Sequence, residues 1–118
     1  MTKTLLEERK LAQTVERLPL NSFTILEFMA TFKELFTHEW EALVERFGLF
    51  GEKKRYTVAT YLANRLYAHS HKSGSCLVPF RKYVSGQRAD YRRATKEERR
   101  VFGSPWIAIY RRTEKNDT

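Results

Sequence analysis

The chain has 118 residues, the size of one domain, and 42% of them are hydrophobic, which is enough apolar material for a single core. Its charge is divided, because the first 50 residues hold six Lys and Arg against eight Glu, whereas the rest hold sixteen against six Asp and Glu. This composition excludes a disordered basic tail and predicts that the second half of the chain faces a polyanion.

Other classes of protein are disfavoured by what the sequence lacks. No apolar run approaches the ~20 residues of a membrane span, and the charged amino terminus predicts a cytoplasmic protein without membrane contact. The single cysteine, Cys76, cannot form an internal disulfide, and beside three histidines it provides no spaced ligand set for zinc. We therefore expect neither a cofactor nor a metal.

Helical periodicity dominates the first half of the chain. Apolar residues recur at helical spacing over residues 4–18, which predicts an amphipathic helix that ends before Pro19. A second helix, capped by Asn21 or Ser22, is predicted to begin near Phe23. Its wide apolar surface places this second helix at the centre of the core.

The third helix is predicted to start at Thr37 as its cap and to end at Gly48. Its apolar residues lie at i, i+3, i+4 and i+7, which are Trp40, Leu43, Val44 and Phe47. Residues 48–51 then form a tight turn, because two apolar residues stand between glycines. This turn leads directly into a fourth helix.

The fourth helix is predicted to run from residue 55 or 57 to His69. Its outer face is polar, and no Asp or Glu occurs between Glu52 and Asp90. An ordinary solvated helix usually carries acid–base pairs at i, i+4. The missing acids therefore indicate that this helix belongs to the basic surface.

Two strands and a short helix are predicted in the remaining sequence. Residues 76–83 have strand composition, with Pro79 favouring a sheet edge, and residues 106–111 form a clearer strand. Residues 84–94 between them read as a basic loop. A capping box over residues 95–98 then opens a short helix that ends at Gly103.

This order of helices, tight turn, helix and two strands resembles the winged-helix DNA-binding superfamily. The resemblance covers about residues 22–112 and depends on topology and charge placement. It implies an α+β, mainly α fold in which a three- to four-helix core is followed by a small antiparallel β-hairpin wing. Residues 1–20 are then an N-terminal amphipathic helix, residues 21–112 the winged-helix-like domain and residues 113–118 a disordered tail.

In the arrangement that the resemblance implies, the fourth helix enters the major groove of DNA. The predicted contacts of this helix are Lys53, Lys54, Arg55, Thr57, Thr60, Tyr61 and Asn64. Arg55 is suited to guanine or phosphate and Asn64 to adenine, so these two are the preferred candidates. The alternative is structural: Thr57 caps the helix, Tyr61 packs in the core and Asn64 is solvated.

The wing is implied to lie on phosphates or in the minor groove, through Arg81, Lys82, Arg88, Arg92 and Arg93. Tyr83 and Tyr91 are interleaved with these cations, a mixture in which rings pack on sugars or bases. The five cations face only one nearby acid, Asp90, although such a run is also typical of a solvated loop. Trp106 is expected to pack in the core rather than against a ligand.

The sequence therefore predicts a double-stranded DNA-binding protein, a small transcriptional regulator and not an enzyme. One alternative is a protein–protein docking module of the same fold. Another is a small basic RNA-binding protein or ribonuclease, although His69 and His71 point away from each other on a helix. The N-terminal helix either forms a homodimer seam or covers one side of the core.

Overall fold

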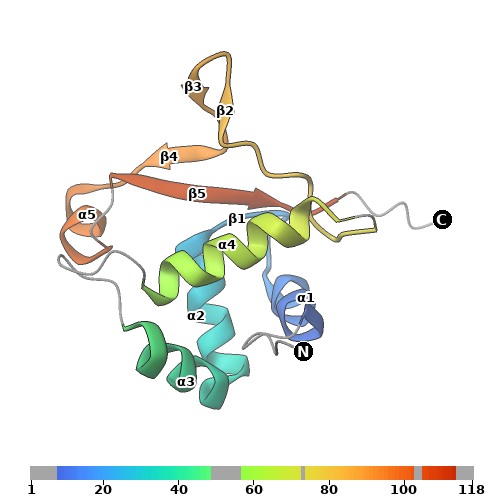
Figure 1. The fold of residues 1–118 in the computed structure, drawn as a ribbon, viewed down its shortest axis with the longest axis vertical. Coiled ribbons are helices and arrows are strands. Elements are labelled where there is room, and N and C mark those ends of the chain that lie inside the picture. Colours follow the sequence, from blue (N-terminus) through green and yellow to red (C-terminus); the bar gives the residue numbers. More distant parts are fainter. Residues whose placement is uncertain (1–7, 49–56, 73, 103–104, 114–118) are drawn as a thin grey trace.

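The computed structural model describes residues 8–48, 57–72, 74–102 and 105–113. Its elements are α1 (Glu8–Arg17), β1 (Ser22–Thr24), α2 (Ile25–Leu35), α3 (Thr37–Phe47), α4 (Val58–Ser70), β2 (Tyr83–Val84), β3 (Gln87–Arg88), β4 (Tyr91–Arg93), α5 (Lys96–Phe102) and β5 (Trp106–Arg111). Helices pack beside a small antiparallel sheet, and a hairpin rises from it (Figure 1). The predicted class, α+β with a mainly helical core and a small hairpin, is confirmed.

The start of α2 differs from the prediction. Thr24 is the cap: its Oγ1 accepts from the Glu27 amide at 3.2 Å, and its own amide donates to Glu27 Oε1 at 2.8 Å. The prediction of Asn21 or Ser22 as cap is wrong because residues 22–24 are extended and pair with β5. That pairing joins segments almost 90 residues apart, so local sequence carries no sign of it.

The start of α3 also differs, whereas its end agrees. Phe36 occupies the cap position, and Thr37 Oγ1 donates to the Lys33 carbonyl of α2 at 2.9 Å, so the prediction of Thr37 as cap is wrong. Gly48 ends the helix at φ 84°, as predicted, because an L side chain would be strained there. The turn predicted after Gly48 lies outside the described residues.

The main sheet has the order β1–β5–β4, with both pairs antiparallel. The prediction of residues 84–94 as a loop is wrong, since they contain β3 and β4. The strand predicted over residues 76–83 is also wrong in extent: Leu77 forms an isolated bridge with Arg112, and strand pairing resumes only at Tyr83. Strand β5 therefore pairs with β1 and with β4, and β4 was not predicted because its residues are polar.

The β2–β3 hairpin is a separate two-stranded unit that extends away from the body (Figure 1). Ser85 and Gly86 connect its strands, and both have positive φ, 53° and 82°. Positive φ at both central residues is the type I′ geometry that matches the twist of paired strands. The turn thus closes a narrow hairpin whose four strand residues are all exposed.

Helices and sheet share one core. Its buried apolar residues are Leu11, Val15, Leu18, Phe23, Ile25, Phe28, Met29, Phe32, Leu43, Val58, Ala59, Leu62, Leu66, Leu77, Phe80, Ile107, Ala108 and Tyr110. The apolar side of α1 therefore lies inside the chain's own core. Across the core, Tyr110 Oη donates to the Ala63 carbonyl of α4 at 3.3 Å. Within the described ranges, no helix is long and apolar enough to cross a membrane.

Arg112 fastens the end of the sheet to α1. Its Nη1 donates to the Val15 carbonyl at 3.2 Å, and its Nη2 donates to the carbonyls of Leu18 and Leu20 at 3.0 and 3.1 Å. The Val15 oxygen lies in the last turn of α1, and those of Leu18 and Leu20 follow it; at a helix carboxyl end, orphan carbonyls and the helix dipole favour a cation. The guanidinium group therefore caps α1 from the far end of the chain.

Candidate nucleic-acid interface

The basic surface is built on the hairpin, β4, α5 and β5. Described residues from 74 to 113 include ten Lys and Arg but only three acids, Asp90, Glu97 and Glu98. Each of these acids forms an ion pair with an arginine of the same region. The remaining cations therefore determine the sign of the surface.

Asp90 is the anchor at the base of the hairpin and is only 2% exposed. Its carboxylate accepts from the Arg81 amide at 2.7 Å, from Arg81 Nη2 at 3.0 Å and from Arg111 Nη1 at 3.1 Å. Burial by itself raises the pKa of Asp90, but the bonds from Arg81 and Arg111 outweigh it and lower that pKa below 3.8. Arg81, a predicted phosphate contact, is thus tied to a carboxylate although its side chain is 57% exposed.

Arg92 is also paired. Its Nη1 and Nη2 donate to the two oxygens of Glu98 at 2.8 and 2.9 Å. This bidentate pair, followed by the amide of Thr95, lowers the pKa of Glu98 to about 2. The expectation that the five wing cations face one acid is therefore wrong, because α5 brings Glu98 back against β4.

The predicted capping box at the start of α5 is confirmed. Thr95 Oγ1 accepts from the Glu98 amide at 3.1 Å, while the Thr95 amide donates to Glu98 Oε1 at 2.9 Å. Arg100 pairs with Glu97 along the helix at i, i+3, as an ordinary surface pair does. Glu98 thus serves both its own helix and Arg92.

Two predicted wing residues, Arg88 and Arg93, contact aromatic rings instead. The Arg88 guanidinium carbon lies 5.5, 5.1 and 5.2 Å from the ring centroids of Tyr83, Tyr91 and Trp106, and that of Arg93 lies 5.0 Å from Trp106. We call these five residues the arginine–aromatic cluster. No carboxylate among the described residues pairs with either arginine. Both therefore keep an uncompensated charge in a position set by the rings.

Trp106 supports this cluster. It is half-buried and lies at the first position of β5, opposite Arg93 of β4. The prediction that Trp106 packs in the core is wrong, because the core begins at Ile107 and leaves the indole beneath two guanidinium groups. A tryptophan just after a turn, opposite a run of arginines, is the signal that would have indicated this role.

The predicted residues of the fourth helix have different environments. Lys53, Lys54 and Arg55 lie outside the described residues. Thr57 is buried and occupies the cap position of α4, although its side chain forms no capping hydrogen bond. Tyr61 stacks on Phe47 at 4.8 Å, in agreement with its structural alternative. Thr60 is half-buried. Asn64 is exposed, whereas every other residue of α4 is buried or half-buried.

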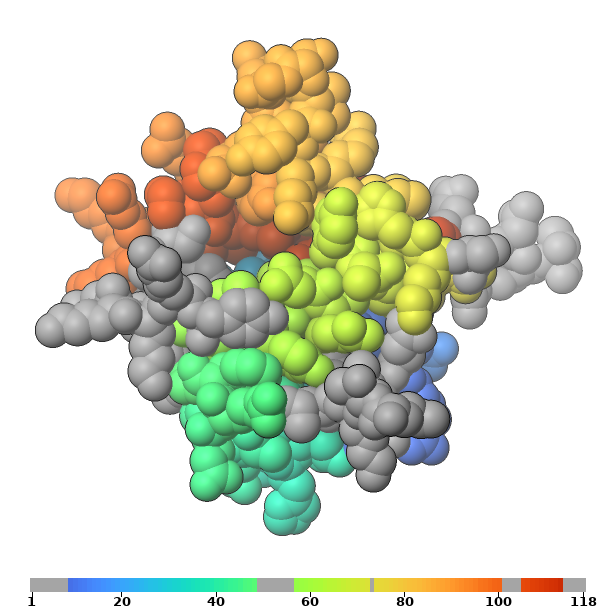
Figure 2. Space-filling view, viewed as in Figure 1, coloured from blue at the N-terminus to red at the C-terminus, as the bar shows by residue number. Residues whose placement is uncertain are grey.

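The carboxyl half of α4 meets the base of the hairpin. Lys82 Nζ lies 4.7 Å from the centroid of the Tyr67 ring, and His71 Nε2 lies 3.0 Å from the Phe80 carbonyl oxygen. The hairpin (yellow to orange) and α4 (yellow-green) consequently lie on one face of the molecule (Figure 2). Lys82 connects the basic hairpin to the helix that carries Asn64.

The two histidines considered for catalysis make separate contacts. His69 Nε2 lies 3.6 Å from Cys76 Sγ, whereas His71 contacts the Phe80 carbonyl oxygen and its ring is tilted against that of Tyr67 at 4.6 Å. In the part of the chain that the structure describes, no cluster of three or more His, Cys, Asp or Glu is arranged to hold a metal. The two imidazoles therefore contact different residues.

Comparisons with protein-family models, curated proteins and solved structures find no match. Two features of the basic surface escaped the sequence analysis: Arg111 as second partner of Asp90, and Trp106 as platform for Arg88 and Arg93. Both depend on the β4–β5 register.

Proposed function

We propose that this protein binds double-stranded DNA through the arginine–aromatic cluster, Lys82 and the exposed side of α4. We infer that it acts as a small transcriptional regulator in the cytoplasm. The observation that carries the proposal is the pair of guanidinium groups of Arg88 and Arg93, held by rings and compensated by no described carboxylate.

An aromatic ring can hold an arginine side chain in place while its N–H donors stay available to a phosphate. A guanidinium group offers five donors in a planar fork, which matches phosphate oxygens in a bidentate manner. A carboxylate partner occupies that fork, as Glu98 does for Arg92, whereas stacking on Trp106 restricts the fork and leaves its edge available. Arg88 and Arg93 are therefore better suited to phosphate than Arg81 and Arg92.

The placement of α4 supports a duplex as the ligand. Helix α4, whose exposed residue is Asn64, and the hairpin lie on the same face of the molecule (Figure 2), so a duplex resting on the hairpin would pass α4 as well. In the proposed complex, Asn64 reads a base edge, Lys53, Lys54 and Arg55 extend the contact beyond its helix, and Arg88 and Arg93 hold phosphates. Thr57 and Tyr61 position α4 rather than touching DNA.

The test is a fluorescence-anisotropy titration with duplex DNA, single-stranded DNA and structured RNA, each at two salt concentrations. We expect the duplex to bind tightest and its affinity to fall steeply with salt, because phosphate contacts release counterions. The double variant Arg88→Ala/Arg93→Ala should lower the salt slope by about 2. Lys96→Ala/Arg99→Ala removes the same charge from α5 and is the matched control.

Three outcomes would contradict the proposal. Equal loss in the α5 control would mean that net charge alone binds DNA. Preference for single strands would instead assign the rings of Tyr83, Tyr91 and Trp106 to base stacking. Absence of binding to any nucleic acid at low salt would favour the protein-docking alternative.

A further inference from the structure

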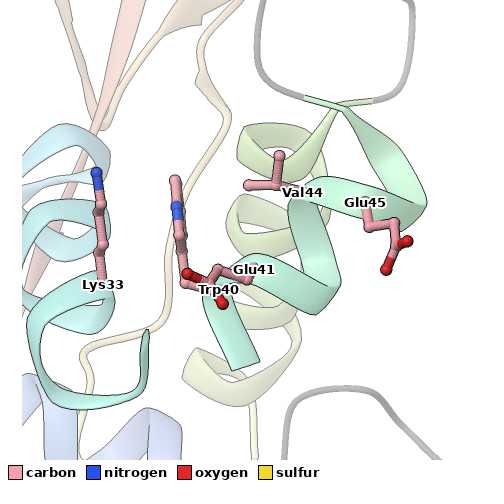
Figure 3. A pocket seen from close by; sticks show the side chains of 5 residues that line it. All are labelled: Lys33, Trp40, Glu41, Val44 and Glu45. Atoms are coloured by element: carbon pink, nitrogen blue, oxygen red, sulfur yellow. The ribbon is translucent and has the colours of Figure 1, made fainter. Parts of the chain in front are cut away.

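A groove between α2 and α3 lies outside the basic surface. It has a volume of about 280 Å³ and is lined by Lys33, Trp40, Glu41, Val44 and Glu45. Lys33 rises on one side of the Trp40 ring, and Val44 and Glu45 stand on the other (Figure 3). An indole and a valine therefore form an apolar floor beside two acidic residues.

The two acids at this groove form no ion pair among the described residues, although Lys33 also lines it. Glu41 and Glu45 are exposed, lie one helical turn apart on α3, and pair with no described residue. Like charges at i, i+4 destabilise a helix slightly. A cation placed between these carboxylates would relieve that repulsion and gain two attractive contacts.

The hairpin has the complementary features. Tyr83 is 58% exposed and Val84 45% exposed, although both are large apolar side chains. Lys82 and Arg88 flank them, and the hairpin contains no acid. Its narrow type I′ turn gives it the form of a projection rather than a flat patch.

We infer that the β2–β3 hairpin of one copy docks in the α2–α3 groove of a second copy of this chain. Val84 and Tyr83 would cover Trp40 and Val44, while Lys82 and Arg88 would face Glu41 and Glu45. The hairpin and α3 lie at opposite ends of the longest axis, which measures 47 Å, so a chain cannot fill its own groove (Figure 1). The contact must therefore be intermolecular.

The proposed contact is head-to-tail, because two different surfaces meet. Contacts of this kind extend into rings or open chains instead of stopping at a symmetric dimer. It requires no nucleic acid and does not depend on the proposed function. If DNA also uses Arg88, the two partners compete for one hairpin.

Sedimentation velocity of the nuclease-treated protein over a range of concentrations tests this inference. We expect the weight-average sedimentation coefficient to rise with concentration at low salt and to fall back at high salt. The variants Glu41→Lys/Glu45→Lys and Lys82→Glu/Arg88→Glu should each associate at least about tenfold more weakly than the wild type, because like charges then meet. Mixing the two variants restores opposite charges at both junctions and should restore association.

Val84→Ser is a second probe that leaves every charge in place and should also weaken association. Lys96→Glu/Arg99→Glu reverses two cations on α5 and should leave association unchanged. Circular dichroism verifies that each variant is folded. The inference is overturned if the wild-type protein stays monomeric at low salt, or if the mixture of charge variants associates no better than each alone.

Discussion

The base of the hairpin and the arginine–aromatic cluster use the same residue type for opposite purposes. At the base, Arg81 and Arg111 both form ion pairs with Asp90, and this carboxylate, which is 2% exposed, neutralises part of their charge. In the cluster, Arg88 and Arg93 rest on rings that position them without neutralising them. The first arrangement holds the base of the hairpin to the sheet, and the second is the one that we propose presents charge to DNA. A count of basic residues cannot separate these two roles.

The largest expected effect is on the base of the hairpin. Asp90→Ala should lower the free energy of unfolding by about 2 kcal/mol, because the Arg81 amide loses its acceptor while the two half-exposed guanidinium groups can turn to water. Chemical denaturation measures it. Asp90→Asn, which keeps an acceptor for the Arg81 amide, should cost less. An Asp90→Ala protein as stable as wild type would show that Asp90 is no anchor.

A second prediction concerns the stability of the folded protein at acidic pH. The folded state lowers the pKa of Asp90 below 3.8 and that of Glu98 from 4.5 to about 2, so the unfolded state binds protons more readily in this range. Stability from both carboxylates should be complete above pH 4.5 and be lost as pH falls toward 2. Thermal melts at a series of pH values test this. Asp90→Asn and Glu98→Gln should each reduce the dependence of stability on pH between about pH 4.5 and 2. An unchanged pH dependence in both variants would contradict the prediction.

Elements formed by neighbouring residues were predictable from the sequence, whereas distant pairings were not. Gly48 ends α3 and Thr95 caps α5 because each acts on residues within one helical turn. The strand over residues 106–111 follows from β-branched and aromatic composition. By contrast, β1 and β4 are strands only because β5 lies between them. Their own residues, Ser-Phe-Thr and Tyr-Arg-Arg, carry no clear period.

The same distinction applies to the candidate site. The basic run and its tyrosines were visible in the sequence, and so was the structural alternative for Thr57 and Tyr61. What local sequence could not show is which arginines are already paired. Arg92 meets Glu98 only after α5 folds back on β4, and Trp106 meets Arg93 only through strand register.

The cluster offers a smaller and more selective perturbation. Arg88→Lys/Arg93→Lys keeps both charges but removes the planar forks that stack on rings and bind phosphate bidentately. We expect duplex affinity to fall by about 1 kcal/mol, roughly fivefold, with the salt slope nearly unchanged. Stability should change by less than about 0.5 kcal/mol, as for other surface substitutions. Full affinity in this variant would mean that charge, not ring-held geometry, is what the cluster contributes.

The smallest expected effect tests whether the β2–β3 hairpin opens independently of the rest of the domain. Ser85 adopts φ 53°, a region that asparagine tolerates better than serine, so Ser85→Asn should stabilise the hairpin by a few tenths of a kcal/mol. Hydrogen exchange measures this at the Ala89 amide, which donates to the Lys82 carbonyl at 3.1 Å. Gly86→Ala, strained at φ 82°, is the opposing control and should speed exchange there.

The unfolding free energy of the whole domain should stay the same in both variants, because β2 and β3 pair only with each other. If it instead changes together with the exchange rate at Ala89, the hairpin folds with the body. Asp90 would then hold the cluster in place as well as the base, and the two groups of arginines would form one cooperative unit.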